Sequence, residues 1–427
     1  METEFETITL QNLTKFVTDC FVAAAVPKNH SEIMAASLIE SDLMGRNGQG
    51  LFMLEECVTD VLSGLIDTRA VPKIDKESSA TAWVDGKNAL GPVVANFCIK
   101  LAIQKAKRVG ASIVVAKHSN PFGAASRYTK LALDEGLIGW ACSNTSPYMV
   151  PNRAKYASIG TNPISVGAPG IFGDYFLLDM STSVASPNRI ALKGFSSEYL
   201  PLGYAINPSG LAETDSYIAA KYKNFLPLGS EEIHSNYKGT GLSLMMDILC
   251  GILGGSYYGT EVGIVGTDCV KRKANISHCF IIVDPKYFAS GFEMRMTELM
   301  VHLRNLEPLD PDNCVRVPGD MTKDIGNKVK EWGGIRYPKF VIESMNKVAK
   351  FLRVKCVELI PKPTTIVLTP SEELAQRLEM EEKSRSMQKE EDASVSQDVP
   401  MDDEVSDKIS LYSVYELDED PSDWMLK

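Results

Sequence analysis

The chain has 427 residues, which is long enough for more than one folded region and a sizeable buried core. Hydrophobic residues make up 44% of the chain and charged residues 23%, the balance of an ordinary soluble globular protein rather than a disordered chain. The formal net charge of -11 argues against binding to a nucleic-acid backbone, which requires a basic surface. We therefore expect no nucleic-acid partner.

The N-terminus, the cysteines and the most apolar stretch exclude other classes of protein. Met1 to Leu10 contains three Glu and no Arg, unlike a mitochondrial transit peptide, and lacks the pattern of a secretory signal. Nine cysteines occur singly, which is typical of buried thiols in a reducing compartment and predicts no metal site. Leu242 to Gly259 contains Asp247 and four glycines, so we expect a buried core helix rather than a membrane span. These features predict a cytoplasmic protein without membrane contact.

Hydrophobic periodicity predicts the elements in chain order. Apolar residues at helical spacing between residues 9 and 45 predict two opening helices, with Asn29 to Ser31 capping the second. From about residue 80 short β-like runs alternate with helical ones, which indicates an α/β protein. We expect strands at 82–85, 112–116, 137–142, 164–168, 175–179 and 278–284, and helices at 93–109 and 292–303.

The composition changes near the C-terminus. After Pro361 the periodicity fades, and residues 371–408 are dominated by Glu, Asp, Ser, Lys and Gln, which bury too little apolar surface to fold. We expect an acidic, largely disordered tail over 361–427, with at most a short helix near 371–385. Leu411 to Trp424 regains aromatic residues, which suits either a docking segment for a protein partner or a solvated tail.

Three local patterns carry candidate binding groups. Asp179 ends an apolar strand, where a carboxylate either orients a cofactor or caps the next turn. The turn Thr161-Asn162-Pro163 offers a hydroxyl and an amide in fixed directions, unless it is only a turn. Lys238-Gly239 opens a helix, where a cation and free amides hold a diphosphate or a lysine simply faces solvent. No Gly-x-Gly-x-x-Gly fingerprint follows a strand.

Six segments, in this order, resemble the signature stretches of the malate/L-lactate dehydrogenase family, which also contains sulfolactate and ureidoglycolate dehydrogenases and cyclic-imine acid oxidoreductases. They are Ser41-Asp42-Leu43-Met44-Gly45, Ser119-Asn120-Pro121-Phe122-Gly123-Ala124-Ala125, Gly160-Thr161-Asn162-Pro163, Leu178-Asp179-Met180-Ser181-Thr182-Ser183, Lys238-Gly239-Thr240-Gly241-Leu242 and Val317-Pro318-Gly319-Asp320. The resemblance covers roughly residues 8 to 355.

The resemblance implies a non-Rossmann α/β fold, a homodimer, and NAD or NADP as cofactor for a small 2-hydroxy or 2-oxo acid. It implies a helical, dimerisation and substrate domain from residues 1–118 with 286–360, built from both chain ends, and a cofactor domain at 119–285. The family's cofactor contacts fall on Thr145, Thr161, Asn162, Asp179, Met180, Ser181, Lys238 and Gly239.

Oxidation of a 2-hydroxy acid needs a general base beside the hydroxyl and a cation for the carboxylate. By resemblance, the family's histidines and arginine for these tasks fall on Gln49, Pro121 and Met53, none of which can do this work. His118 is the nearest histidine that could replace the base, beside Asp179 as a second catalytic candidate, and Arg46 or Arg153 could replace the arginine. Two hypotheses follow: a working NAD(P)-dependent oxidoreductase, or a non-catalytic descendant that binds a dinucleotide or a protein partner.

Overall fold

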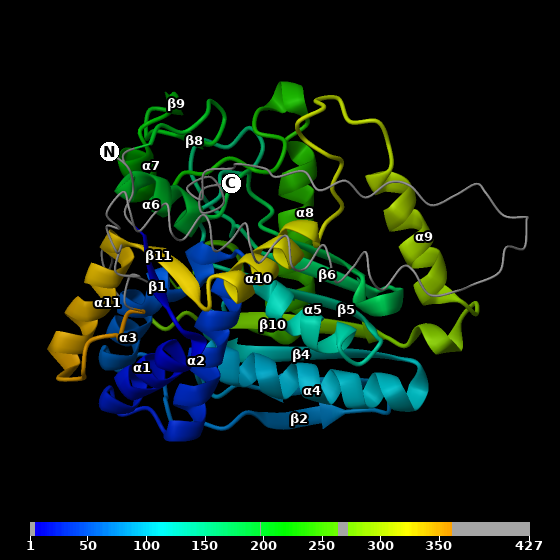
Figure 1. The fold of residues 1–427 in the computed structure, drawn as a ribbon, viewed down its shortest axis with the longest axis horizontal. Coiled ribbons are helices and arrows are strands. Elements are labelled where there is room, and N and C mark those ends of the chain that lie inside the picture. The colour runs from blue at the N-terminus through cyan, green and yellow to red at the C-terminus, as the bar shows by residue number, and fades with distance from the viewer. Residues whose placement is uncertain (1–4, 197, 264–271, 361–427) are drawn as a thin grey trace, which may run out of the picture. The chain divides into compact units, whose positions relative to one another are not determined.

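The computed structural model describes residues 5–360, apart from residue 197 and residues 264–271 (Figure 1). The tail over 361–427, its short helix near 371–385 and the segment Leu411 to Trp424 lie outside the described residues. Within the described ranges short strands alternate with helices, which confirms the prediction of an α/β protein. Each strand and helix predicted from residue 80 onward is present, with ends that differ by a few residues.

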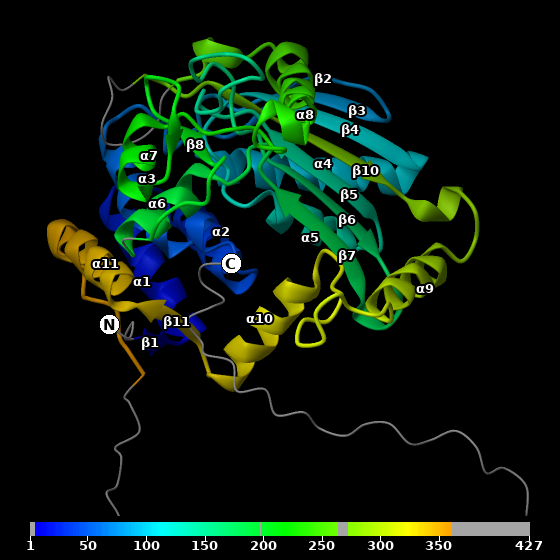
Figure 2. The ribbon, with the colours of Figure 1, turned by 90° about the horizontal axis from the view of Figure 1, so that it is seen from above.

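The main sheet of the described chain has the strand order β2-β3-β4-β10-β5-β6-β7 (Figure 2). Neighbouring strands are antiparallel except β3 and β4, which run parallel. This is not the parallel sheet of a Rossmann domain, which agrees with the absence of its glycine fingerprint. The strands are β2 (Lys73–Glu77), β3 (Thr81–Asp85), β4 (Ala111–Ser119), β5 (Ile138–Ser143), β6 (Ile164–Pro169), β7 (Tyr175–Met180) and β10 (Ile276–Val283).

Helices cover both faces of this sheet. On one face α4 (Gly91–Val109) and α5 (Ala125–Leu133) bury an apolar core that contains Ile99, Tyr128 and Phe280. On the other face α8 (Tyr237–Asp247) packs against β5 and β10 through a smaller core around Met246. The central strands are therefore largely buried, whereas the edge strand β2 is exposed.

A helical region beside the sheet is built from both ends of the described chain, as the family resemblance implied. One core holds Leu13 and Phe21 near the start of the chain together with Val329 and Val348 near its end. The short strands β1 (Phe5–Ile8) and β11 (Ile335–Pro338) pair antiparallel and tie the two ends together. Its helices are α1 (Leu10–Ala23), α2 (Lys28–Leu43), α3 (Leu54–Leu62), α10 (Asp320–Glu331) and α11 (Lys339–Leu352).

A fourth, smaller core is formed by residues between β7 and α8 in the sequence. Ile190, Ala219 and Phe225 are its central buried residues. Two short helices and a two-stranded ribbon supply them: α6 (Pro187–Phe195), α7 (Ser216–Tyr222), β8 (Ala205–Ile206) and β9 (Ala212–Glu213). The remaining helix, α9 (Phe292–Arg304), packs against β6 and β7.

Two sequence expectations, on a helix cap and on the cysteines, are wrong. Pro27, rather than Asn29 to Ser31, precedes α2, and no side chain caps that helix. Cys314 and Cys356 are exposed rather than buried, because they lie in segments outside the helices and strands. The eight described cysteines are all free.

The expected core helix at 242–259 is buried on one face only. α8 continues through a π-helical turn at Ile248–Ile252, with Ser243, Met246 and Cys250 buried. The opposite face is exposed because α8 covers the sheet from outside and nothing described packs on it. That face presents Leu244, Ile248, Ile252 and Leu253. In the described part of the chain, none of the helices is both long and apolar enough to cross a bilayer.

Candidate active site

The carboxyl ends of four sheet strands meet at one edge. These are β3, β4, β5 and β7, which all run in the same direction. β3 and β4 pair parallel, β10 lies antiparallel between β4 and β5, and β6 lies antiparallel between β5 and β7. Thr145 follows β5, Asp179 lies near the end of β7, and the turn at Thr161 enters β6 at this same edge. The residues expected to contact a cofactor are thereby gathered from distant parts of the sequence.

Asp179 is the centre of contacts between three segments. Its side chain is 9% exposed, and its Oδ2 accepts hydrogen bonds from the backbone N–H and the hydroxyl of Ser126. The same oxygen lies 3.4 Å from the Nε of Arg46. Because Ser126 opens α5, the carboxylate also complements the positive end of that helix. Asp179 is thus held in place by the sheet, by α5 and by the loop after α2.

The loop after α2 is held in place by Asp42, near the end of that helix. This carboxyl group is buried, and its Oδ2 accepts from the Leu51 N–H at 2.9 Å and the Tyr337 hydroxyl at 2.7 Å. Burial raises the pKa of Asp42 to about 7, although both hydrogen bonds act to lower it. A Cβ on Gly50 would lie 1.8 Å from the Asp42 carboxylate, so only glycine fits there.

Gln49, Met53 and Pro121 take positions on or near this loop. Gln49 lies in the short helical turn Asn47–Gln49, whose Gly48 carbonyl accepts a hydrogen bond of 2.8 Å from Asn188 on α6. Met53 packs against the core of the helical region. Pro121 is exposed in the loop between β4 and α5. None of the three side chains carries a titratable group.

His118 lies near the end of β4, at the same edge of the sheet as Asp179 but several strands away. Its Nδ1 is 3.1 Å from Asp85 Oδ1, and its backbone N–H donates to Ser256 at 3.0 Å. The residue adopts the left-handed region at φ 51°. Three strands separate β4 from β7, which corresponds to roughly 19 Å between the strand axes. The structure therefore does not bring His118 and Asp179 together.

The other four histidines are engaged or remote. His278 is fully buried between Ser143 and Ser119, which lie 2.9 Å and 2.7 Å from its ring nitrogens, and burial lowers its pKa to about 3. His30 is buried with its ring on the Thr68 carbonyl. His234 and His302 are exposed on other segments. Among the residues that the structure describes, no cluster of His, Cys, Asp and Glu could hold a metal ion.

Asn162 joins the strand-end turns to α8. It is fully buried, and its Oδ1 accepts from the Thr145 N–H at 2.9 Å. Its Nδ2 donates to the Ser243 carbonyl and hydroxyl, both at 3.0 Å. The side chain is therefore a structural bridge that holds the edge in shape. Thr145 and Thr161 approach each other within 3.5 Å through their hydroxyl oxygens.

The turn after β7 adds a hydroxyl without a partner. Met180 packs on the α8 side of the sheet, and the Ser181 hydroxyl donates to the Ser183 carbonyl. Thr182 is fully buried beside Thr161, whose carbonyl accepts its N–H at 3.0 Å. The Thr182 hydroxyl makes no hydrogen bond to any described residue. A buried hydroxyl of this kind is what a ligand with polar groups would satisfy.

The start of α8 has the properties of an anion site. Asn236, which precedes the helix, makes no side-chain capping bond, and the ammonium-bearing Lys238 is exposed in the first turn. Gly239 lies so close to Leu228 that a Cβ would be 2.4 Å from its backbone. The Lys238 N–H donates to the Ser235 carbonyl at 3.0 Å, so the anion-favouring features are the exposed ammonium and the positive end of the helix. With the Thr182 hydroxyl, they fit a dinucleotide.

Sequence reasoning missed Ser126, although it directly follows the segment Ser119 to Ala125. Its role depends on a contact with β7, more than fifty residues later, which no local pattern contains. The two arginines considered as replacements for the family's arginine have different partners. Arg46 reaches Asp179, whereas Arg153 pairs with Glu232 in a different loop.

Comparisons with known proteins agree with this geometry. The family model described as malate/L-lactate dehydrogenase matches residues 8–346. A malate dehydrogenase of Pyrococcus abyssi is 32% identical over 81% of this chain and 95% of its own. An L-sulfolactate dehydrogenase of Methanocaldococcus jannaschii is 31% identical over 82% and 98%. The solved malate dehydrogenase of Pyrococcus horikoshii superimposes with a TM-score of 0.74 at 28% identity, covering 83% of this chain and 99% of that one.

Proposed function

The chain belongs to the malate/L-lactate dehydrogenase family, and on that premise we propose that it binds a nicotinamide dinucleotide together with a small 2-hydroxy or 2-oxo acid. Hydride transfer between them, the family's chemistry, proceeds here without a histidine of the protein at the reacting hydroxyl and is therefore slow. The observation that supports the proposal is the polar edge around Asp179, where residues that the resemblance matches to the family's cofactor contacts gather.

The dinucleotide supplies the hydride acceptor or donor when bound. The residues that would hold it are Lys238, Gly239 and Thr182 at the diphosphate, and Thr145, Thr161, Asp179, Met180 and Ser181 along the strand ends. Asn162 supports them through Thr145 and Ser243 rather than through a free polar atom of its own. The cytoplasmic location predicted from the sequence and the homodimer implied by the family are part of this proposal.

Arg46 is the residue that we propose for the substrate carboxylate. Its Nε pairs with the Asp179 carboxylate at 3.4 Å, and about one-third of its side chain is exposed. The buried Nδ2 of the adjacent Asn47 lacks a described partner. A partly exposed guanidinium at this turn favours an anionic ligand, because it can bind a carboxylate. Met53 cannot do this, since its thioether packs into the helical core.

The missing acid–base group limits the reaction. A positioned general base contributes about 10² to 10⁴ in rate, and neither Gln49 nor Pro121 can take up a proton. His118 is held beside Asp85, and His278 is buried with both nitrogens engaged. A specific observation thus favours a second candidate function, a non-catalytic protein that only binds the two ligands.

One pair of measurements separates these functions. Fluorescence titration of NADH and NADPH measures dinucleotide binding, and a coupled assay with malate, lactate, sulfolactate and their oxo acids measures turnover. We expect saturable binding with turnover at least about 10²-fold below an active relative measured in parallel. Binding without any turnover would establish the non-catalytic function, and no binding of either dinucleotide would refute the proposal.

A further inference from the structure

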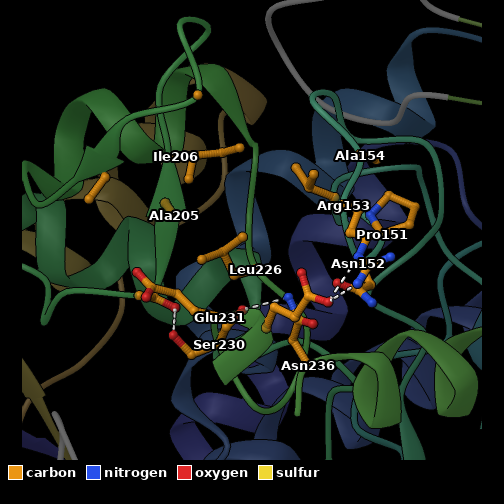
Figure 3. A pocket seen from close by; sticks show the side chains of 15 residues that line it. Pro151, Asn152, Arg153, Ala154, Ala205, Ile206, Leu226, Ser230, Glu231 and Asn236 are labelled. Carbon is orange, nitrogen blue, oxygen red and sulfur yellow. Dashed lines mark hydrogen bonds and ion pairs between the residues drawn. The ribbon is translucent and has the colours of Figure 1, made fainter. Parts of the chain in front are cut away.

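A cavity of about 260 Å³ has Asn236, the residue before α8, in its lining, and Asp179 does not line it. Figure 3 shows the side chains that line this cavity. Three segments line it: residues 150–154, the β8–β9 ribbon with its flanks, and residues 226–236. Its volume is small for a complete cofactor but suits one half of a dinucleotide. Asn236, which lines it, immediately precedes Tyr237 and Lys238 in the first turn of α8.

One wall of the cavity is apolar. Val150, Ala205 and Leu226 are buried there, and Ile206 adds an aliphatic side chain. Such a wall accommodates a flat ring system, because the apolar surface leaves water when the ring packs on it. The cavity is thus divided into an apolar side and a polar side.

The polar side consists of hydrogen-bond acceptors. Asn236 is 6% exposed, its Nδ2 donates to the Ser230 carbonyl at 3.2 Å, and its buried Oδ1 has no described partner. The Asn152 Oδ1 is also buried without a described partner, while the Asn152 N–H donates to Thr240 on α8. The carboxylates of Glu231 and Glu232 complete this side. Unmatched acceptors call for a ligand that donates hydrogen bonds.

The charges exclude an anionic group inside the cavity. Arg153 is the cation in its described lining, and its guanidinium is already bound to Glu232, with 2.8 Å from Nε to Oε1 (Figure 3). Glu231 adds a further negative charge at the rim. A phosphate here would meet carboxylates rather than a free cation, which raises its energy. The phosphate-favouring position is outside, at Lys238.

We propose that this cavity binds the adenosine half of the dinucleotide and selects NAD over NADP. The base packs on the apolar wall, and the ribose hydroxyls and the exocyclic amine donate to Asn152, Asn236 and Glu231. In NADP a phosphate replaces the 2′-hydroxyl, so the hydrogen bond that this hydroxyl donates is lost. The phosphate would also be repelled by the Glu231 carboxylate. This inference rests on the proposed dinucleotide binding and adds its specificity.

The test is a set of fluorescence titrations with NADH and with NADPH on the full chain. We expect NADH to bind about tenfold more tightly than NADPH, because one carboxylate faces the added phosphate. Glu231→Arg should reduce or invert this ratio, and the milder Glu231→Gln should reduce it in the same direction. Glu298→Arg on the exposed face of α9 introduces the same charge change away from the cavity and should leave the ratio unaltered.

Each outcome decides a separate statement. Equal or tighter binding of NADPH by the unmodified chain would overturn the inference but leave the proposed function standing. A preference for NADH that both Glu231 variants and the Glu298 variant share unchanged would show that the adenosine lies elsewhere. Absence of binding by both dinucleotides would overturn the proposed function and this inference together.

Discussion

The cofactor-facing and substrate-facing halves of the candidate site are built differently. Around Asn162 the polar atoms are buried and satisfy one another across three segments. Around Gln49 the loop is held through its backbone: the Leu51 N–H donates to the Asp42 carboxylate, and the Gly48 carbonyl accepts from the Asn188 side chain. Side chains on such a loop can change without unfolding the protein, whereas Asn162 cannot. On the proposed function, this difference would let the substrate-facing side chains change while the cofactor-facing half keeps its form.

The strongest way to break this comparison is to restore the lost side chains. The triple variant Gln49→His, Met53→Arg and Pro121→His should raise turnover of a 2-hydroxy acid by about 10² to 10⁴, because it returns a base and a carboxylate clamp. Steady-state assays measure this gain, and circular dichroism shows whether the variant folds. A folded triple variant as inactive as the parent would mean that the substrate half has changed beyond these positions.

The buried carboxyl of Asp42 provides the next largest effect. Its folded-state pKa of about 7 exceeds the ordinary 3.8, so its contribution to stability is complete below pH 4 and is lost as pH rises toward 7. His278 has the opposite sign, because its lowered pKa of about 3 makes stability rise between pH 3 and 6.5. Each shift corresponds to at most about 5 kcal/mol.

In the unmodified chain these two pH dependences oppose each other between pH 4 and 6.5. Asp42→Asn should leave the His278 effect alone, so urea midpoints should rise steadily across that window. His278→Gln should give the reverse slope. Parallel curves for the parent and Asp42→Asn would show that Asp42 is ionised throughout.

A smaller loss is expected from opening the cofactor-facing network. Asn162→Ala leaves the Thr145 N–H and the Ser243 groups without their partner, which should lower the free energy of unfolding by about 2–4 kcal/mol and weaken NADH binding. Asn188→Ala removes one half-buried hydrogen bond to Gly48 in the substrate-facing half and should cost about 1 kcal/mol. Equal losses in urea titrations of both variants would erase the contrast between the halves.

The smallest effect concerns Arg46, which connects the two halves. Arg46→Met should weaken binding of an oxo acid to the NADH-loaded protein by about tenfold, and it should weaken NADH binding less, through the loss of the contact with Asp179. Arg46→Lys should retain part of the affinity, since it keeps the charge but not the planar fork. Calorimetric titration with oxaloacetate measures both. An unchanged oxo-acid affinity in Arg46→Met would assign the carboxylate to another group.

Local patterns predicted the elements well but the site only in part. The strands around Ile113, Trp140 and Leu177 have β-branched or apolar runs that tertiary packing does not override. The order of the strands could not be read, because β10 enters between β4 and β5 from far along the sequence. Family resemblance located Asp179 and Thr161 at one edge, whereas Ser126 and the Asn236 cavity depend on contacts between distant segments.

The place of β10 in the sheet also determines when this protein can fold on a ribosome. β10 lies between β4 and β5 and pairs with both. Its first residue, Ile276, is synthesised more than 130 residues after Ser143, the last residue of β5. At 5–20 residues per second, the two strands wait on the order of ten seconds with unpaired edges. Exposed edges of that duration attract other chains, so the nascent polypeptide is expected to depend on chaperone protection until β10 emerges.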